Sequence, residues 1–358
     1  MTVAAPLRAV KQLSIMPTLR CTAACAHCGT YSSPKIKTTL TRSALFKAID
    51  EAAEIKYAAV VFTGGEPLLE WDLTVDGIRR AAELGLRTRI VSNGFWARTE
   101  ERAKKAVHAL VDAGLDELNL STGDEHAKYV PLDSVVRAVT AAIDATLPCV
   151  IMVEVRKDPK ITAQTLTQHP VLASLLKNRS HAFSISQSPW MSLDPVESSN
   201  IEGQALVNRS NIAKRKGCDS VLRDTTVYSD GKVLACCGIG AKSIAELNLG
   251  RFPESSLSSL DRKSRDDFLK RWLRVDGPEK ILAWAATFDP SIKWENMYAH
   301  RCQACIRLYS DKSVREVILK NAQQMIPEVV AREWLLFEFE PTLLKEATMV
   351  TDKPFDGH

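Results

Sequence analysis

The chain has 358 residues, a net charge of +4, 45% hydrophobic residues and 25% charged residues. This composition is ordinary for a globular protein, and the length allows one large domain with a smaller one. No run of lysine and arginine is long or interleaved with aromatic residues, so a nucleic-acid-binding surface is not expected. No apolar stretch approaches the length of a membrane span, and residues 1–14 lack the apolar core of a signal peptide. We therefore expect no membrane association and a cytoplasmic location.

The first half of the chain alternates short β-rich runs with amphipathic helical patterns. Strands are predicted at 11–18, 58–64, 87–93, 117–122, 149–155 and 182–188, and helices at 43–55, 76–85, 99–114, 131–145 and 162–177. Successive β-α units predict a parallel sheet with right-handed crossovers. Such a sheet is either doubly wound or an incompletely closed barrel. In both cases the functional loops follow the carboxyl ends of the strands.

The second half of the chain has a different pattern. A polar segment with prolines and serines at 186–204 is the predicted linker. Residues 225–240 predict a β-hairpin that turns at Asp230-Gly231, and helices are expected at 258–275, 279–288, 312–326 and 331–339. We therefore predict a first domain over 1–200, a second over 211–310 and a C-terminal helical tail over 311–358.

The nine cysteines are the main functional signal. An odd number in a chain expected to be cytoplasmic argues against a disulfide framework and favours metal chemistry. Cys21, Cys25 and Cys28 follow the first predicted strand with C-x3-C-x2-C spacing. Three ligands leave a structural zinc site incomplete, and a C-x2-C redox pair leaves Cys21 unexplained. A four-iron cluster held by three thiolates would leave one iron free to bind a reactant.

The same spacing, on the first loop of a six-unit β/α series, resembles the radical S-adenosylmethionine superfamily. TGGEP at 63–67, at the end of the second predicted strand, resembles that family's second motif. The resemblance implies a partial (β/α)6 barrel in which the three cysteines hold a [4Fe-4S] cluster and the open iron binds S-adenosylmethionine. It also implies that Gly64, Gly65, Glu66 and Pro67 meet the methionyl ammonium, since glycines permit close backbone approach and a carboxylate suits a cationic amine. A zinc knuckle with an ordinary Gly-Gly turn is the alternative.

Two further segments resemble cofactor-binding parts of the same family. SNG at 92–94 implies that Asn93 contacts the carboxylate of the cofactor, and NLSTGDEH at 119–126 implies that Ser121 hydrogen-bonds its ribose. Turn formation explains both segments equally well, because Asn-Gly and Ser-Thr-Gly are turn sequences.

A second group of cysteines has its own pattern. Cys218, Gly231 and Cys236 form C-x12-G-x4-C, which resembles the opening of the SPASM/twitch domain that follows many of these barrels. Cys302 and Cys305 bring the thiolates to four, enough to close an auxiliary [4Fe-4S] cluster. The later C-x5-C-x3-C run of a full SPASM domain is missing, so the resemblance is to the one-cluster twitch form, with a β-hairpin and helices. A four-cysteine zinc ribbon is the alternative.

Two cysteines remain outside these groups. Cys237 is adjacent to Cys236 on a predicted strand, so the two side chains are expected on opposite faces, with Cys236 as the ligand. Cys149 opens a predicted buried strand and is expected in the core.

Polar side chains near the carboxyl ends of the strands are candidates for a substrate pocket. Asp124 and His126 are the candidates for accepting a proton as a substrate radical is oxidised, although a solvated or helix-capping role explains them as well. The other candidates for the lining are Tyr129, Glu154, Arg156, Gln187 and Trp190.

The resemblance implies an oxidoreductase that reductively cleaves S-adenosylmethionine to a 5′-deoxyadenosyl radical, which abstracts a substrate hydrogen. Reduced flavodoxin or ferredoxin is the expected electron donor, and the auxiliary cluster would take up the substrate's electron in a net oxidation such as a crosslink. We favour a ribosomally synthesised peptide as substrate, because the insertion between Cys236 and Cys302 and the C-terminal helices add surface. Only 20 residues precede Cys21, so we expect no fused N-terminal peptide-recognition domain. This weakens the prediction of a peptide substrate without removing it, because a separate protein can supply the recognition.

Two other functions stay open on the sequence. One is a small-molecule dehydrogenase that acts on an amino sugar or alcohol in natural-product biosynthesis. The other is a non-catalytic zinc or iron–sulfur scaffold.

Overall fold

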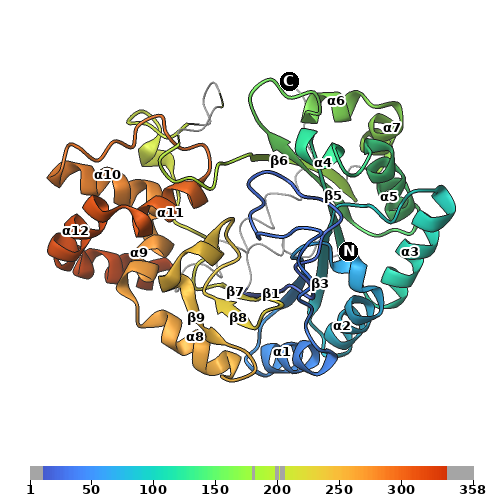
Figure 1. The fold of residues 1–358 in the computed structure, drawn as a ribbon, viewed down its shortest axis with the longest axis horizontal. Helices are drawn as coiled ribbons and strands as arrows, with labels where there is room; N and C mark the ends of the chain where they lie inside the picture. The colour runs from blue at the N-terminus through green and yellow to red at the C-terminus, as the bar shows by residue number, and fades with distance from the viewer. Residues whose placement is uncertain (1–10, 180–181, 198–200, 202–205, 337–358) are drawn as a thin grey trace.

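The structure is a computed structural model that describes residues 11–179, 182–197, 201 and 206–336 (Figure 1). One sheet of nine strands runs through them in the order β6-β5-β4-β3-β2-β1-β7-β8-β9. The first six strands are β1 (Gln12–Ile15), β2 (Ala59–Phe62), β3 (Arg87–Ser92), β4 (Glu117–Thr122), β5 (Cys149–Val155) and β6 (Phe183–Pro189). They pair in parallel with their neighbours, as predicted. Within the described residues the sheet is open, with β6 and β9 at its edges.

Helices cover the outer, convex face of this sheet (Figure 1). They are α1 (Arg42–Glu54), α2 (Trp71–Glu83), α3 (Glu100–Asp112), α5 (Leu132–Asp144), α6 (Ala163–Gln168) and α7 (Pro170–Arg179). Leu13, Ile15 and Phe62 are completely buried in the core. Their strand neighbours on the other face, such as Gln12, line a cavity on the concave side. Strand alternation therefore separates an apolar layer beneath the helices from a polar inner wall.

Two predicted helices differ from the structure because of local stop signals. The predicted helix at 162–177 is two helices, α6 and α7, because Pro170 lacks an N–H group and cannot continue α6. The predicted helix at 258–275 is also two helices, α8 (Leu257–Arg265) and α9 (Phe268–Asp276). The carboxylate of Asp267 starts the second of these by accepting hydrogen bonds from the backbone N–H groups of Leu269 and Lys270.

The helix predicted at 76–85 begins earlier than expected. Its first residue is Trp71, directly after a 3-10 turn, η2 (Pro67–Glu70), that follows the TGGEP segment. The turn starts at a proline whose fixed φ suits a first helical position. The TGGEP segment is therefore held between a strand and a helix.

The predicted hairpin is present and extends the first sheet. β7 (Asp224–Val227) and β8 (Lys232–Leu234) are antiparallel, and β7 pairs in parallel with β1, with Gln12 opposite Asp224. A third strand that was not predicted, β9 (Asn248–Arg251), pairs with β8. The predicted linker begins too early, since 186–189 belong to β6. Of that linker, 198–200 and 202–205 lie outside the described residues.

The remaining helices gather at one end of the molecule, away from α3, α5 and α7 (Figure 1). They are α9, α10 (Pro278–Phe288), α11 (Arg301–Ser310) and α12 (Lys312–Asn321). α11 was not predicted, and α12 ends before 326 in a 3-10 turn, η6 (Ala322–Met325). Residues 326–336 are helical, and 337–339 of the last predicted helix lie outside the described residues.

Trp272 is buried and meets Trp284 edge-on, with ring centroids 4.8 Å apart. This contact joins α9 to α10 as part of the core of the helical end. No helix in the described part of the chain is both long and apolar enough to cross a membrane. The division at 1–200, 211–310 and 311–358 stays a prediction.

Candidate functional site

The loop that follows β1 brings its three cysteines to one cavity. Cys21, Cys25 and Cys28 line a space of about 170 Å³ at the carboxyl ends of the strands. The loop is fixed at its start, where Cys21 N donates to Ser33 O (3.3 Å). This is the rim at which an α/β sheet of this kind carries its active site.

Burial controls the protonation of two of these thiols. Burial raises the pKa of Cys21 to about 11. Burial, followed by repulsion from Cys28 and Cys21, raises the pKa of Cys25 to about 12. Without a metal centre the thiols of Cys21 and Cys25 therefore hold their protons. Since thiolates are the metal ligands, loading the site releases those protons.

The TGGEP segment packs directly on the three-cysteine loop. Gly65 N donates to Thr18 O (3.0 Å) and Glu66 N donates to Arg20 O (2.8 Å). A Cβ at Gly65 would lie 2.1 Å from Arg20 O, and one at Gly64, where φ is +121°, would lie 2.7 Å from Thr18 O. We expected these glycines to permit approach of a cofactor. In the structure, the close approach that requires them is to the loop after β1.

Glu66 is completely buried and ties the ends of β2 and β3 together. Its carboxylate accepts hydrogen bonds from Asn93 N (2.7 Å), Ser92 Oγ (2.9 Å) and Leu68 N (3.2 Å). Burial raises the pKa of Glu66 to about 7 in spite of these three donors. The contact of this carboxylate with a cofactor ammonium stays a prediction.

The structure brings most of the predicted residues to the smaller cavity. Its wall includes Cys21, Cys25, Cys28, Gly64, Gly65, Asn93, Ser121 and His126, together with Trp190. Glu66 and Pro67 are buried beside this cavity and are not on its wall. Asp124 is not on the wall either, and its carboxylate accepts the backbone N–H groups of Lys160 (3.0 Å) and Ile161 (2.9 Å).

His126 is oriented by a buried carboxylate. Its Nδ1 lies 3.1 Å from Glu154 Oε2, and its ring meets Trp190 edge-on, with centroids 6.3 Å apart. An imidazole that is held by a carboxylate on one side and faces a cavity is a suitable proton acceptor or donor. Of the two residues proposed for proton transfer, His126 is the one that faces the cavity.

Glu125 is a supporting residue that the sequence did not indicate. It ion-pairs with Arg156 (2.8 Å) and with Lys128. Burial alone would raise the pKa of Glu125, but these hydrogen bonds lower it to about 2. Glu125 N donates to Glu154 Oε1 (2.6 Å), so the ionised pair also fixes the carboxylate behind His126.

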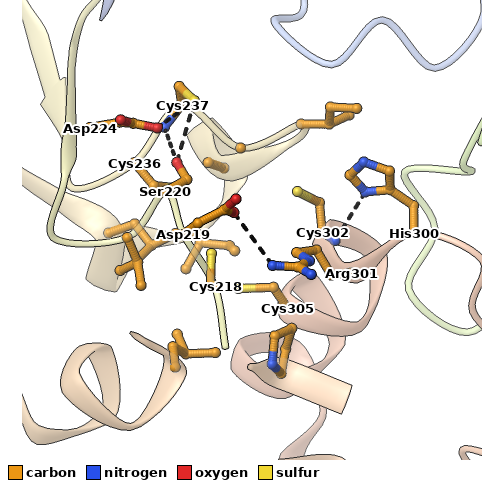
Figure 2. A pocket seen from close by; sticks show the side chains of 18 of the residues that line it. Cys218, Asp219, Ser220, Asp224, Cys236, Cys237, His300, Arg301, Cys302 and Cys305 are labelled. Atoms are coloured by element: carbon orange, nitrogen blue, oxygen red, sulfur yellow. Dashed lines mark hydrogen bonds and ion pairs between the residues drawn. The ribbon is translucent and has the colours of Figure 1, made fainter. Parts of the chain in front are cut away.

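The second group of cysteines comes together from three separate segments (Figure 2). Cys218 precedes β7, Cys236 follows β8, and Cys302 and Cys305 lie on α11. All four line a cavity of about 500 Å³, and the side chains of Cys218, Cys302 and Cys305 extend toward a shared space. Burial raises the pKa of each of the four thiols, that of Cys302 to about 12, and repulsion from neighbouring thiols adds to the effect for Cys236, Cys302 and Cys305.

Cys237 belongs to a different set of contacts (Figure 2). Its thiol donates to Asp224 Oδ2 (3.1 Å) and lies 3.3 Å from Ser220 Oγ. Neither Cys236 nor Cys237 is on a strand, because β8 ends at Leu234. Alternation along a strand therefore does not explain why the two side chains point in different directions. The Cys237 side chain is oriented by its hydrogen bonds to Asp224 and Ser220. Cys149 is buried in the core, as predicted.

The two cysteine groups are in direct contact through their loops. Gly240 N donates to Gly29 O (2.8 Å), and a Cβ at Gly29 would lie 2.5 Å from Cγ2 of Ile239. Val91 of β3 lines both cavities. The smaller and the larger cavity therefore share a wall on the concave face of the sheet.

The donor sets suit iron–sulfur clusters. Three cysteines line the smaller cavity, and five line the larger one, where the Cys237 thiol is already bonded to Asp224. Thiolates are the usual ligands of such clusters. Among the residues with described side chains, no three His, Cys, Asp or Glu groups converge on a single metal ion.

Comparison with known families identifies the first part of the chain. Residues 15–157 match the sequence model of the Radical SAM superfamily. This stretch is a radical SAM superfamily domain, and it contains the three-cysteine loop and the TGGEP segment. The resemblance seen in the sequence is confirmed for this part of the protein.

Several curated proteins are similar to part of the chain. A peptide biosynthesis protein, YydG, of Bacillus subtilis is 28% identical over 126 residues, which is 35% of this chain and 40% of that protein. The PqqA peptide cyclase of Methylocella silvestris is 34% identical over 127 residues, 35% of this chain and 32% of that protein. A GTP 3′,8-cyclase of Methanopyrus kandleri is 29% identical over 180 residues, 47% of this chain and 53% of that protein. The chain spans about a third to a half of the length of these relatives.

The likeness in fold extends further than the likeness in sequence. The crystal structure of anSMEcpe with bound AdoMet and Cp18Cys peptide superposes with a TM-score of 0.52 at 14% identity, over 91% of this chain and 99% of that one. The predicted fold class, an open and mostly parallel α/β barrel, is thereby confirmed.

Proposed function

We propose that the protein is a radical S-adenosylmethionine enzyme that carries out a net oxidation on a side chain of a ribosomally synthesised peptide. One observation carries this proposal. Within a radical SAM superfamily domain, three thiols share one cavity with Gly64, Asn93 and His126. The cavity lies at the carboxyl ends of the strands, where loops from several strands can act on one ligand.

Each residue of this cavity has a proposed task. Cys21, Cys25 and Cys28 would hold a [4Fe-4S] cluster, and Asn93 and Ser121 would hold the cofactor beside it. A reduced cluster with S-adenosylmethionine bound at this site would supply the radical chemistry for abstraction of a substrate hydrogen. The contribution of the protein is to orient the reacting groups and to exclude competing reactions.

His126 would accept the proton that the substrate releases. Glu154 Oε2, at 3.1 Å from Nδ1, holds the imidazole in place at the wall of the cavity. Trp190 meets the ring edge-on, with centroids 6.3 Å apart, and contributes to the same cavity wall.

The larger cavity would hold the auxiliary [4Fe-4S] cluster on Cys218, Cys236, Cys302 and Cys305. Four protein ligands leave no iron open, so this centre suits electron transfer and not substrate activation. Its loop contacts the three-cysteine loop at Gly29 and Gly240. A cluster on these four cysteines would supply an electron acceptor close to the open site, as a net oxidation of the substrate requires.

Two relatives support a peptide substrate, since YydG and the PqqA peptide cyclase are both named for peptide chemistry. The GTP 3′,8-cyclase is named for a nucleotide substrate, which is a small molecule. The second candidate function is therefore a small-molecule dehydrogenase that acts on an amino sugar or alcohol.

Anaerobic reconstitution tests the proposal in two steps. Two clusters predict about eight irons per chain, and dithionite with S-adenosylmethionine should then yield 5′-deoxyadenosine. Zinc in place of iron, or no 5′-deoxyadenosine, would overturn the proposed enzyme. The neighbouring genes are then searched for a short peptide reading frame, and incubation with a peptide encoded there should give a product that has lost two hydrogens. Oxidation of an amino sugar and not of the peptide would favour the second candidate.

A further inference from the structure

The larger cavity is lined by strand side chains as well as by the cysteines. The strand residues on its wall are Gln12, Arg89, Val91, Asn119, Met152 and Asp224, from β1, β3, β4, β5 and β7. Val91 also lines the smaller cavity. Because alternate residues of a strand share a face, Arg89 lies about 6–7 Å from Val91 along β3. Arg89 is therefore separated along β3 by one same-face position from Val91, which lines the cavity of the proposed reaction centre.

Arg89 is buried without good acceptors. Its side chain is 12% exposed, and its Nε is buried with no hydrogen-bond partner. The nearest acceptors are Gln12 Oε1 at 3.5 Å and Glu117 Oε1 at 3.9 Å. A guanidinium has five N–H donors, and burial of such a cation without close acceptors is unfavourable.

Asn119 carries a second unpaired group on the same wall. The residue is 6% exposed, and its Oδ1 is buried with no hydrogen-bond partner. Asn119 is opposite Val91 in the parallel register of β3 and β4, so it lies on the strand next to Arg89. The carboxylate of Asp224 on this wall is already bonded to Cys237 and Gln12. Two buried polar atoms on neighbouring strands thus belong to side chains of one cavity, Arg89 Nε without an acceptor and Asn119 Oδ1 without a donor.

We infer that Arg89 and Asn119 form a binding site for a carboxylate-bearing segment of the substrate. This site rests on the proposed function and specifies its substrate class as a peptide with an acidic side chain at or beside the modified residue. The planar guanidinium of Arg89 binds the two carboxylate oxygens, and Asn119 Oδ1 accepts an amide N–H of the same segment.

Binding to the cluster-loaded protein without reductant tests this inference, because no turnover occurs. The probes are N-acetyl-L-glutamate N-methylamide, its glutamine counterpart, and glutarate, measured by ligand-observed NMR. We expect the glutamate probe to bind at least about 10-fold more tightly than the glutamine probe. Glutarate should bind more weakly than the glutamate probe, because it has no N–H for Asn119. Glutarate binding as tightly as that probe would overturn the peptide assignment.

Variants of two arginines on one strand provide the matched comparison. Arg89→Gln should weaken binding of the glutamate probe roughly 10- to 100-fold and leave the glutamine probe unaffected. Arg89→Lys should give an intermediate loss of affinity, since lysine keeps the positive charge but lacks the planar guanidinium that binds both carboxylate oxygens. Arg87, on the same face of β3, also has a buried Nε without a hydrogen-bond partner, but its side chain is 39% exposed, lies 3.6 Å from Asp116 and does not line the larger cavity. Arg87→Gln should therefore change nothing, and an equal effect of both glutamine variants would overturn the inference.

A measurement on the unmodified sequence covers the case in which Arg89→Gln does not fold. Phenylglyoxal labels accessible arginines, and the glutamate probe should protect Arg89 and not Arg87 in a peptide map. Absence of protection overturns the site. Formation of 5′-deoxyadenosine by the reduced wild-type protein is scored separately, so loss of that activity would count against the proposed function while the binding result stands.

Discussion

The two cysteine groups are assembled in opposite ways. The first lies within one loop of eight residues, from 21 to 28, and its position follows from the end of a single strand. The second is drawn from the segment before β7, the segment after β8 and helix α11, so it exists only when the whole second half is folded. One group is local in sequence, and the other depends on long-range packing.

The difference extends to what surrounds the thiols. The three-thiol cavity is shared with glycine backbone, Asn93 and Ser121, which leaves room for a ligand that the protein does not supply. The four-thiol group has as many donors as a closed cluster needs. An open site and a closed site, joined where Gly240 N meets Gly29 O, are the arrangement expected of a reaction centre and an electron acceptor.

The largest effect is expected from removing one thiol of the open site. Cys25→Ala should abolish 5′-deoxyadenosine formation and reduce iron from about eight to about four per chain, because two thiolates do not retain the cluster. Iron and sulfide analysis with product chromatography measures both. Cys149→Ala is the control, since that thiol is buried in the core away from both groups. Cleavage of S-adenosylmethionine that persists in Cys25→Ala would refute the assignment of the open site.

Removing one thiol of the closed site should have a narrower effect. We expect Cys305→Ala to lose about four irons and all substrate oxidation while it still cleaves S-adenosylmethionine, because the open site keeps its three ligands. Cys237→Ala is the matched control, since its thiol is bonded to Asp224 and Ser220. Full iron content in Cys305→Ala, or iron loss in Cys237→Ala, would contradict the ligand set.

Local signals made the open site predictable from the sequence. Cysteine spacing, strand composition and helical periodicity are each contained in a short window, and all six parallel strands follow from them. The pairing of β7 with β1 joins residues more than two hundred positions apart and has no local signal. Helix α11 was missed although His300 caps it, with Cys302 N donating to His300 Nδ1 (3.1 Å).

Polar residues within the predicted strands were a sequence signal for the polar inner wall of the barrel. Arg89 and Asn119 interrupt strands that should be apolar on both faces in a covered parallel sheet. A charge in such a strand indicates a polar interior, and the register that brings these residues to one wall becomes visible only in the folded sheet. The role of the TGGEP glycines was also hidden, because their nearest atoms belong to Thr18 and Arg20 of another segment.

A glycine substitution tests whether the open site depends on that packing. A Cβ at Gly65 would lie 2.1 Å from a backbone oxygen, so Gly65→Ala must displace the loop after β1. We expect a loss of about 2–4 kcal/mol in the free energy of unfolding, with iron lost from the open site alone. Urea unfolding and iron analysis measure these effects. Gly85→Ala is the control, since φ is +75° there but no atom lies within 4 Å. It should cost about 1 kcal/mol and retain all iron.

The smallest effect concerns the buried carboxylate that joins β2 to β3 behind the open site. Burial raises the pKa of Glu66 from 4.5 to about 7, so the folded protein binds this proton more tightly than the unfolded chain does. The resulting stabilisation is complete below pH 4.5 and is lost as the pH rises through about 7. Glu66→Gln removes this titration. The stability of the wild type relative to this variant should therefore fall by ~1–3 kcal/mol between about pH 5 and about pH 8.

Urea unfolding of both metal-free proteins at the two pH values measures this change. Glu70→Gln is the control, because Glu70 is a partly exposed carboxylate on the same 3-10 turn, paired with Arg20 at 3.1 Å. If the difference in unfolding free energy between the wild type and Glu66→Gln stays constant or grows with pH, the ionised Glu66 carboxylate does not destabilise the folded protein. The three donors around it would then outweigh its burial, and the rigidity of the open site would depend on an ionised carboxylate and not on a protonated one.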